Sequence, residues 1–342
     1  MNRSIYLTLA LLFLCLVGSP ASTAMAASDQ IIMRWGHSHA VDDPLNLAVI
    51  HFKKLMDEMT KGRVKVEPYP ASQLGSQPAM CEQLQIGSLE FLNFTAGGLE
   101  PFDPSRKAGL LDLPFLVETF EQAWHFHDTQ VVRDLVTPLR TNGIRFMYPA
   151  ILGLRHFTTS VRPITRPEDL RGLKMRITQS EMIKDIINVG FGGSAIAIPW
   201  GDTYLALQQK VVDGQENPIS VIYTNRIYEV QSYLSIVGHQ MNANQLWVSE
   251  KKFNSWPPDI QKAVLEAGKI AMETYYLALD EIQKEYLKKL EAMPNFKVNR
   301  PDVAPFRKAV EPVYALYEKK HGSIVRDVVK AAEATMQKYP KR

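Results

Sequence analysis

The chain has 342 residues, 46% of them hydrophobic and 22% charged, with 39 Lys and Arg against 36 Asp and Glu. Duplex binding needs a concentrated positive face, so a nearly balanced charge without a long basic run argues against nucleic acid as a partner. A chain of this length can bury its own core and favours two lobes over one.

The first 26 residues are predicted to be a cleaved signal peptide. The apolar run from Ile5 to Val17 is too short to cross a bilayer comfortably, and Ala24-Met25-Ala26 has the small-x-small pattern of a cleavage site. No later apolar run reaches membrane-spanning length. We therefore expect a soluble protein exported to the periplasm.

The two cysteines predict neither a lipid anchor nor a disulfide. Cys15 lacks the small residue just before it that lipid attachment needs, and it lies within the expected signal peptide. Cys81 would then be the only cysteine of the mature chain, so the fold must rest on core burial. Its place in an amphipathic helix indicates a buried structural thiol and not a nucleophile.

From Met33 onward, short β-type runs alternate with amphipathic helices, which is typical of βαβ units and a largely parallel sheet. Apolar residues from Ala48 to Met59 keep helical spacing and stop before Gly62, after which Val64–Val66 alternates as a strand. The later elements predicted for the first lobe are helices at 78–86, 121–126 and 130–141 and strands at 89–94 and 144–148.

A second lobe is predicted to begin near Ile151. Its elements are strands at 151–160, 173–177 and 195–198 and helices at 180–189 and 202–212. The alternating segment 242–249 would return the chain to the first lobe, so that both lobes are discontinuous. The expected division gives residues 27–150 and 242–280 to the first lobe, and 151–241 and 281–342, with the C-terminal helices, to the second.

Apolar residues from Pro258 to about Met293 keep helical spacing, which predicts one helix roughly 50 Å long at 1.5 Å per residue. Such a helix is longer than one lobe is wide and could run under both. The alternative is two helices with a break near Gly268.

Motifs for covalent, nucleotide or metal chemistry are missing from the sequence. Gly190, Gly192 and Gly193 lack the spacing of a dinucleotide loop and the lysine of a P-loop, and neither H-E-x-x-H, C-x-x-C nor G-x-S-x-G occurs. His125 and His127 would face different directions on a helix, which indicates a surface feature. We therefore expect no cofactor, no metal and no enzymatic activity.

Three polar residues, Arg155, Arg176 and Asn217, fall at strand ends or turns where two lobes could face one another. A guanidinium matches a carboxylate with two parallel hydrogen bonds and keeps its charge. A surface ion pair with an acidic neighbour is the alternative for either arginine. His37 and His39 follow a strand end and could share a face toward a ligand.

Several motifs together resemble the DctP-type solute receptors of tripartite ATP-independent periplasmic (TRAP) transporters, in the family's order and over essentially the whole mature chain. They are Tyr69-Pro70-Ala71-Ser72-Gln73-Leu74-Gly75, Leu113-Pro114-Phe115, Ser160-Val161-Arg162-Pro163-Ile164, Pro167-Glu168-Asp169-Leu170-Arg171-Gly172-Leu173-Lys174-Met175-Arg176, Tyr204-Leu205-Ala206-Leu207 and Val212-Asp213-Gly214-Gln215-Glu216-Asn217-Pro218.

The resemblance implies a two-lobed periplasmic binding protein fold, with crossing strands, that closes on a small organic acid. It makes Arg176 the salt-bridge partner of the ligand carboxylate, Arg155 a second contact and Asn217 a hydrogen-bond partner. The remaining positions implied or proposed as ligand contacts are Trp35, His37, His39, Thr95, Trp200 and His239.

The implied partners are the small and large membrane subunits of a TRAP transporter, and we expect a monomeric receptor for a dicarboxylate or a sugar acid. An aromatic or other monocarboxylate is the alternative ligand, for which Trp35, Trp200 and Trp247 leave room. A receptor for an ATP-driven importer, a sensor subunit and a periplasmic hydrolase or lyase are the rival functions.

Overall fold

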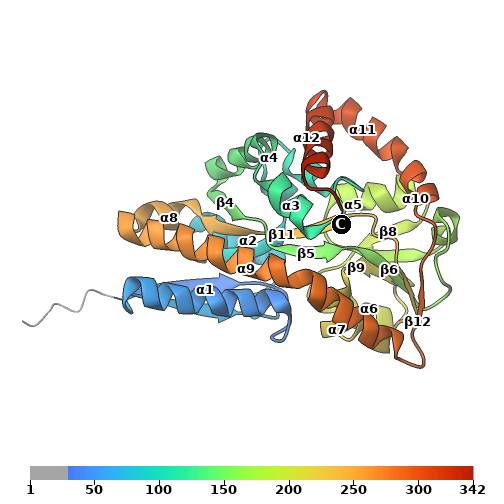
Figure 1. The fold of residues 1–342 in the computed structure, drawn as a ribbon, viewed down its shortest axis with the longest axis horizontal. Helices are drawn as coiled ribbons and strands as arrows, with labels where there is room; N and C mark the ends of the chain where they lie inside the picture. Colours follow the sequence, from blue (N-terminus) through green and yellow to red (C-terminus); the bar gives the residue numbers. More distant parts are fainter. Residues whose placement is uncertain (1–29, 342) are drawn as a thin grey trace, which may run out of the picture.

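Two six-stranded sheets lie side by side in the computed structural model, which describes residues 30–341, and helices cover both sheets (Figure 1). This arrangement confirms the expected two-lobed α/β fold. The predicted signal peptide and Cys15 lie outside the described residues. No helix in the described range is long and apolar enough to cross a membrane.

The sheet of the first lobe combines the N-terminal strands with one late strand. It consists of β1 (Ile31–Gly36), β2 (Val64–Tyr69), β3 (Phe91–Thr95), β4 (Ile144–Tyr148), β5 (Ile151–Leu154) and β11 (Met241–Ser249). The order is β2-β1-β3-β11-β4, and β5 pairs with β11. β1 runs parallel to β2 and β3, whereas β11 is antiparallel to each of its neighbours. The sheet is therefore mixed and not largely parallel, because β11 returns from the other lobe in the opposite direction.

The second sheet has the order β12-β10-β6-β9-β7-β8. Its strands are β6 (His156–Thr159), β7 (Lys174–Ile177), β8 (Ser194–Ala197), β9 (Gly214–Asn217), β10 (Tyr233–Ser235) and β12 (Lys297–Asn299). β6 runs antiparallel to β9 and β10, while β7 is parallel to β8 and β9. This sheet is mixed because β6, which enters from the first lobe, runs opposite to its neighbours β9 and β10.

Two extended segments cross between the sheets, in addition to the long helix Pro258–Glu291. The predicted strand at 151–160 is divided at Arg155, because β5 joins the first sheet and β6 the second. The second crossing joins β10 to β11. The backbone N–H of Arg155 donates to the carbonyl of Gln240 at 2.8 Å, so the two crossing segments hydrogen-bond to each other. Interlobe motion would therefore be concentrated at these few residues.

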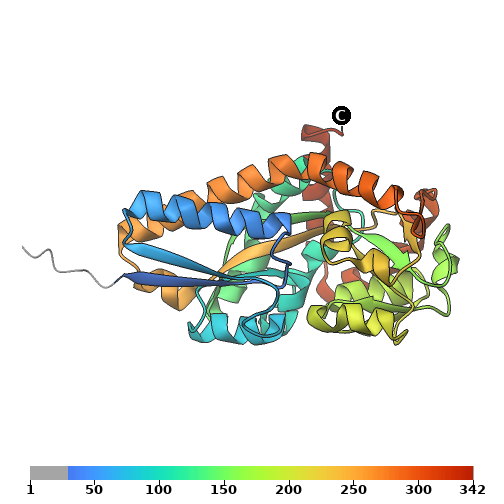
Figure 2. The same cartoon turned by 90° about the horizontal axis from the view of Figure 1, so that it is seen from below.

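The helix α9 (Pro258–Glu291) is unbroken over 34 residues, as the single-helix prediction requires, and the two-helix alternative is wrong. A Cβ atom at Gly268 would lie 3.1 Å from the ring of Tyr148, so glycine here permits close packing and does not end the helix. Val264 packs in the hydrophobic cluster that includes the strands of the first lobe. Leu290 belongs to a separate hydrophobic cluster built from residues of the second lobe. Figure 2 shows α9 running along both lobes.

The other helices cover the two sheets. α1 (Pro44–Thr60) lies along α9, and the terminal α12 (Ile324–Lys338) packs on α3 (Phe120–His127) and α4 (Gln130–Val136) (Figure 1). The last helix thus returns to the first lobe's side of the molecule. The remaining helices are α2 (Gln77–Ile86), α5 (Glu181–Asp185), α6 (Trp200–Gln208), α7 (Ile219–Thr224), α8 (Glu250–Ser255), α10 (Ala304–Ala309) and α11 (Glu311–His321).

Candidate ligand-binding site

The candidate site is a cavity between the two sheets, beside the point where the crossing segments meet. Strand ends and helix starts of both lobes supply its walls, as expected for a ligand site in an open α/β sheet. The lining residues are Ser38, His39, Gln77, Thr95, Leu152, Arg155, Arg176, Thr178, Trp200, Asn217, Val221, Asn242 and Asn244.

Arg176 lies on β7, is 2% exposed and reaches this cavity. Its Nε and Nη2 donate to the carbonyl of Ile198 at 2.9 and 2.7 Å, and the indole of Trp200 lies 5.2 Å from the guanidinium carbon. Within residues 30–341 no carboxylate forms an ion pair with it. Burial, followed by the positive charge of Arg155, lowers the pKa of Arg176 to about 9. A buried cation without a counter-ion is costly, which suits a site that an anion completes.

Arg155 also lines the cavity, but its charge is already neutralised. Its guanidinium forms a two-pronged ion pair with Glu216 of β9, with Nη2 at 2.6 Å from Oε1. Burial alone would raise the pKa of Glu216, but the charges and hydrogen bonds of Arg155 and His239 together outweigh burial and lower it to about 2. The structure thus gives Arg155 a protein carboxylate as its partner, where the resemblance implied a ligand contact.

His239 does not reach the cavity. It is fully buried beside Glu216, with its Nε2 at 3.3 Å from the carboxylate Oε2, and its ring stacks on Phe157 with 4.5 Å between centroids. His239 therefore supports the Arg155–Glu216 pair from the side away from the cavity. Contrary to the prediction, His239 is therefore not placed to contact a ligand in the cavity.

The first lobe brings two of its four expected residues to the cavity. His39 and Thr95 line it. Trp35 instead lies in the core, where its ring packs on Phe52 and Phe91 and its Nε1 donates to Asn93 at 2.6 Å. It faces α1 because alternate residues of a strand point to opposite faces.

His37 is buried and is held by Asn46, whose Oδ1 lies 3.1 Å from Nε2 of the imidazole. Burial above all lowers its pKa to about 3. The pair His37 and His39 thus does not share a face toward a ligand.

Asn217 reaches the cavity, and its amide donates to Gln215 on the same strand. Two further amides, Asn242 and Asn244 on β11, were not among the predicted site residues. Both polar side-chain atoms of Asn242 are buried and have no hydrogen-bond partner among the described residues, and Nδ2 of Asn244 donates to Nε2 of His39 at 2.9 Å. Their i,i+2 spacing on a strand with mostly apolar neighbours was a usable signal.

His125, His127 and Cys81, which were predicted to lie outside the ligand site, do not line the cavity. His127 is buried, and its Nδ1 donates to the carbonyl of Ala123 at 2.7 Å, so the surface interpretation is wrong for it. His125 stacks on Tyr339. No group of three His, Cys, Asp or Glu side chains that could hold a metal occurs in the described part of the chain. Cys81 is buried, as expected, and burial raises the pKa of its thiol.

Two lobes joined by crossing strands around a cavity with an uncompensated cation define a solute-binding protein. Residues 35–320 match the family described as "Bacterial extracellular solute-binding protein, family 7". The chain belongs to this family.

Named relatives and a solved structure agree with this assignment. The sialic acid-binding periplasmic protein SiaP of Vibrio cholerae is 31% identical, over 78% of this chain and 82% of that protein. The C4-dicarboxylate-binding protein DctB of Bacillus subtilis is 28% identical, over 88% and 86%. The sugar acid binding protein DctPAm of Advenella mimigardefordensis, solved with galactonate, is 27% identical with a TM-score of 0.84, over 89% of this chain and 98% of that one.

Proposed function

We propose that this protein is the periplasmic receptor of a TRAP transporter and that a small organic acid places its carboxylate on Arg176. The main observation behind this proposal is the buried guanidinium of Arg176, which among residues 30–341 has only the Ile198 carbonyl as a hydrogen-bond acceptor. A carboxylate in the cavity would supply the missing charge with two parallel hydrogen bonds. The named ligands of SiaP, DctB and DctPAm, all carboxylic acids, support this role.

The cavity favours a hydroxylated monocarboxylate, such as a sugar acid, over a dicarboxylate. Of its two arginines, Arg155 is paired with Glu216, so a second ligand carboxylate would find no unpaired guanidinium among the lining residues. The other polar groups are neutral amides and hydroxyls, supplemented by His39, and they can exchange hydrogen bonds with ligand hydroxyls. The side chain of Asn242 offers two N–H donors and one carbonyl acceptor, and none of them has a partner among the described residues.

An aromatic carboxylate receives less support. Trp35 and Trp247 are buried in the core, where Nε1 of Trp247 donates to the carbonyl of Phe94, so Trp200 is the one tryptophan on the described cavity wall. The relatives named above are binding proteins for organic acids, which supports binding and not catalysis. Closure of the lobes about Arg155 and Gln240 would bury the acid, and the closed form would be presented to the membrane subunits by a monomeric receptor.

A thermal-shift screen of organic acids, followed by calorimetry on each stabilising acid, tests the proposal. We expect sugar acids to stabilise the protein, by roughly 2.7 kcal/mol at 100 times the dissociation constant. Arg176→Gln should abolish the response. Arg162→Gln is the matched control, because Arg162 also donates to backbone carbonyls, those of Asp169 and Arg171, but lies outside the cavity. Equal binding by the Arg176 variant and wild type would refute the proposed role of this residue.

A further inference from the structure

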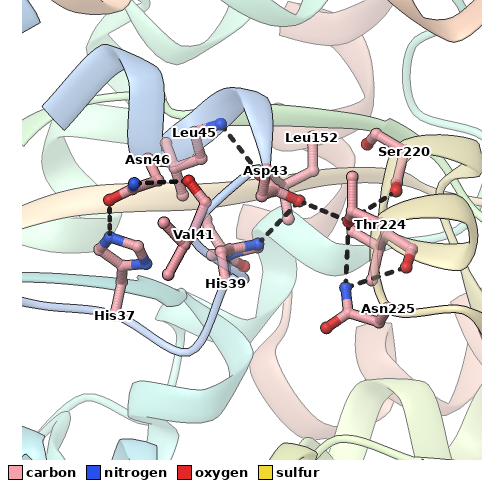
Figure 3. A network of polar contacts seen from close by, with 12 residues as sticks. His37, His39, Val41, Asp43, Leu45, Asn46, Leu152, Ser220, Thr224 and Asn225 are labelled. Atoms are coloured by element: carbon pink, nitrogen blue, oxygen red, sulfur yellow. Dashed lines mark hydrogen bonds and ion pairs between the residues drawn. The ribbon is translucent and has the colours of Figure 1, made fainter. Parts of the chain in front are cut away.

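Asp43 is a buried carboxylate that contacts both lobes. It precedes α1 of the first lobe, where its Oδ1 accepts a hydrogen bond from the backbone N–H of Leu45 at 2.9 Å. An N-cap of this kind needs only one carboxylate oxygen. The second oxygen, Oδ2, lies 3.2 Å from the hydroxyl of Thr224, the last residue of α7, whose Ile219 and Ile222 pack in the second lobe's core (Figure 3). Asp43 is 1% exposed and Thr224 is half-buried, so the contact lies at the edge of the interlobe interior.

Thr224 has an alternative acceptor within its own helix. Its hydroxyl lies 2.9 Å from the carbonyl of Ser220, the i−4 bond common for threonine in helices, and the amide of Asn225 donates to the same hydroxyl at 3.2 Å (Figure 3). A hydroxyl carries one proton, so it donates either to Asp43 or to Ser220. Separation of the lobes would therefore leave Thr224 satisfied by Ser220, and Asp43 would turn to water.

His39 joins Asp43 to the cavity. Its Nδ1 lies 3.6 Å from Oδ2 of Asp43, its Nε2 lies 2.9 Å from the amide of Asn244, and both His39 and Asn244 line the cavity. Burial opposes ionisation of Asp43, but His39 and the N–H of Leu45 outweigh it and lower the pKa of this carboxyl. The carboxylate that contacts Thr224 is thus ionised and is positioned by a residue of the cavity wall.

Given the proposed function, we propose that the contact between Asp43 and Thr224 is a latch that holds the two lobes closed, and that His39 couples it to occupancy of the cavity. Thr224 does not line the cavity that contains Arg176, but it lines an adjoining pocket that shares Ser38 and Trp200 with that cavity. Its effect on the affinity of the Arg176 site would therefore come through closure. A hydrogen bond is lost once donor and acceptor separate by more than a few tenths of an ångström, so the latch exists only in the closed form. Because the open form has its own bond to Ser220, the latch adds a modest stabilisation and permits release.

The dissociation rate of a bound acid measures the latch directly. Galactonate, glucuronate and N-acetylneuraminate are the probes, and stopped-flow displacement follows whichever of them binds wild type. Thr224→Val, which keeps the side-chain shape, should release the probe about three- to tenfold faster, the range expected for one hydrogen bond. Thr224→Ser should restore slow release. Thr335→Val is the matched control, because Thr335 makes the same i−4 bond, to Ala331 in α12, without a partner from the other lobe.

The distance between the lobes, measured without any acid, gives an independent test. Spin labels at Lys54→Cys on α1 and Gln208→Cys on α6 report it by pulsed EPR, and the native Cys81 is buried. Thr224→Val should shift the distances toward the open form relative to wild type and Thr335→Val. If none of the three acids binds wild type, the proposed ligand class fails and this measurement decides the latch alone. Unchanged release rates, or unchanged distances in that case, would overturn the latch.

Discussion

Arg155 and Glu216 neutralise each other at the crossing between the lobes, 61 residues apart in the chain and both at most 2% exposed. Nη2 of Arg155 also donates to the backbone carbonyl of Glu216 at 2.6 Å. The pair therefore ties the divided strand β5–β6 to β9 by side-chain and main-chain bonds. It leaves Arg176 as the arginine of the cavity whose charge only a ligand can balance.

Glu216→Gln should destabilise the protein by about 3–5 kcal/mol, because it leaves the charge of Arg155 buried without compensation. The double variant Arg155→Met/Glu216→Leu removes both charges and should lose less than the single variant. Urea unfolding of the wild type and both variants measures this difference. A double variant that loses as much stability as Glu216→Gln, or more, would mean that the unpaired charge of Arg155 does not cause the loss.

Arg176→Ala should weaken binding of a sugar acid at least a hundredfold, which corresponds to about 2.7 kcal/mol or more. Arg176→Lys should recover only part of the loss, because lysine keeps the charge but not the planar pair of donors. The stability of the ligand-free protein should not fall by the same amount, since Arg176 has no counter-ion to lose. Calorimetry and unfolding of the same samples separate the two effects, and a near-normal lysine variant would argue for simple charge attraction.

Trp35→Ala and His39→Ala should behave in opposite ways. Trp35 fills the core between β1 and α1, so its truncation should cost roughly 3–5 kcal/mol of unfolding free energy while the folded fraction binds with unchanged affinity. His39 lines the cavity, so its truncation should lower affinity about tenfold or more. Calorimetry corrected for the folded fraction compares them. Loss of affinity in a folded Trp35 variant would mean that Trp35 contributes to the ligand site.

Asp112→Asn should stabilise the protein in a pH-dependent way. Burial raises the pKa of Asp112 to about 7, although Arg155 and the N–H of Gly97 oppose this shift. Because the folded pKa lies above the unfolded value, the contribution of Asp112 to stability is present below about pH 4 and is lost as the pH rises through 7. The variant should gain roughly 2–4 kcal/mol at pH 8, and less at pH 5. An equal gain at both values, from urea unfolding, would mean that burial does not control this carboxyl.

Local sequence patterns were enough to predict the lobed α/β architecture and the longest helix. Helical spacing through Gly268 predicted α9 correctly, because apolar periodicity depends only on neighbouring residues and the glycine needed no special conformation. Arg176 was selected as the residue for a carboxylate because the family resemblance implies that role, since its position at a strand end also allowed an ion pair with an acidic neighbour. His39, Thr95 and Asn217 were likewise found among the cavity residues.

Tertiary structure alone decided which polar groups face the cavity and which face each other. Glu216 and Asn217 are neighbours on β9, yet one pairs with Arg155 and the other lines the cavity. The sequence could not reveal that Arg155 has a protein partner, since this depends on how β5, β6 and β9 meet at the crossing. The same reason places Trp35 in the core, because the residues that surround it, Phe52 and Phe91, come from separate elements. Which charges are compensated and which side chains are buried depends on contacts between segments that are distant in the sequence. Apolar periodicity and motifs, in contrast, depend on residues that are close together in the sequence.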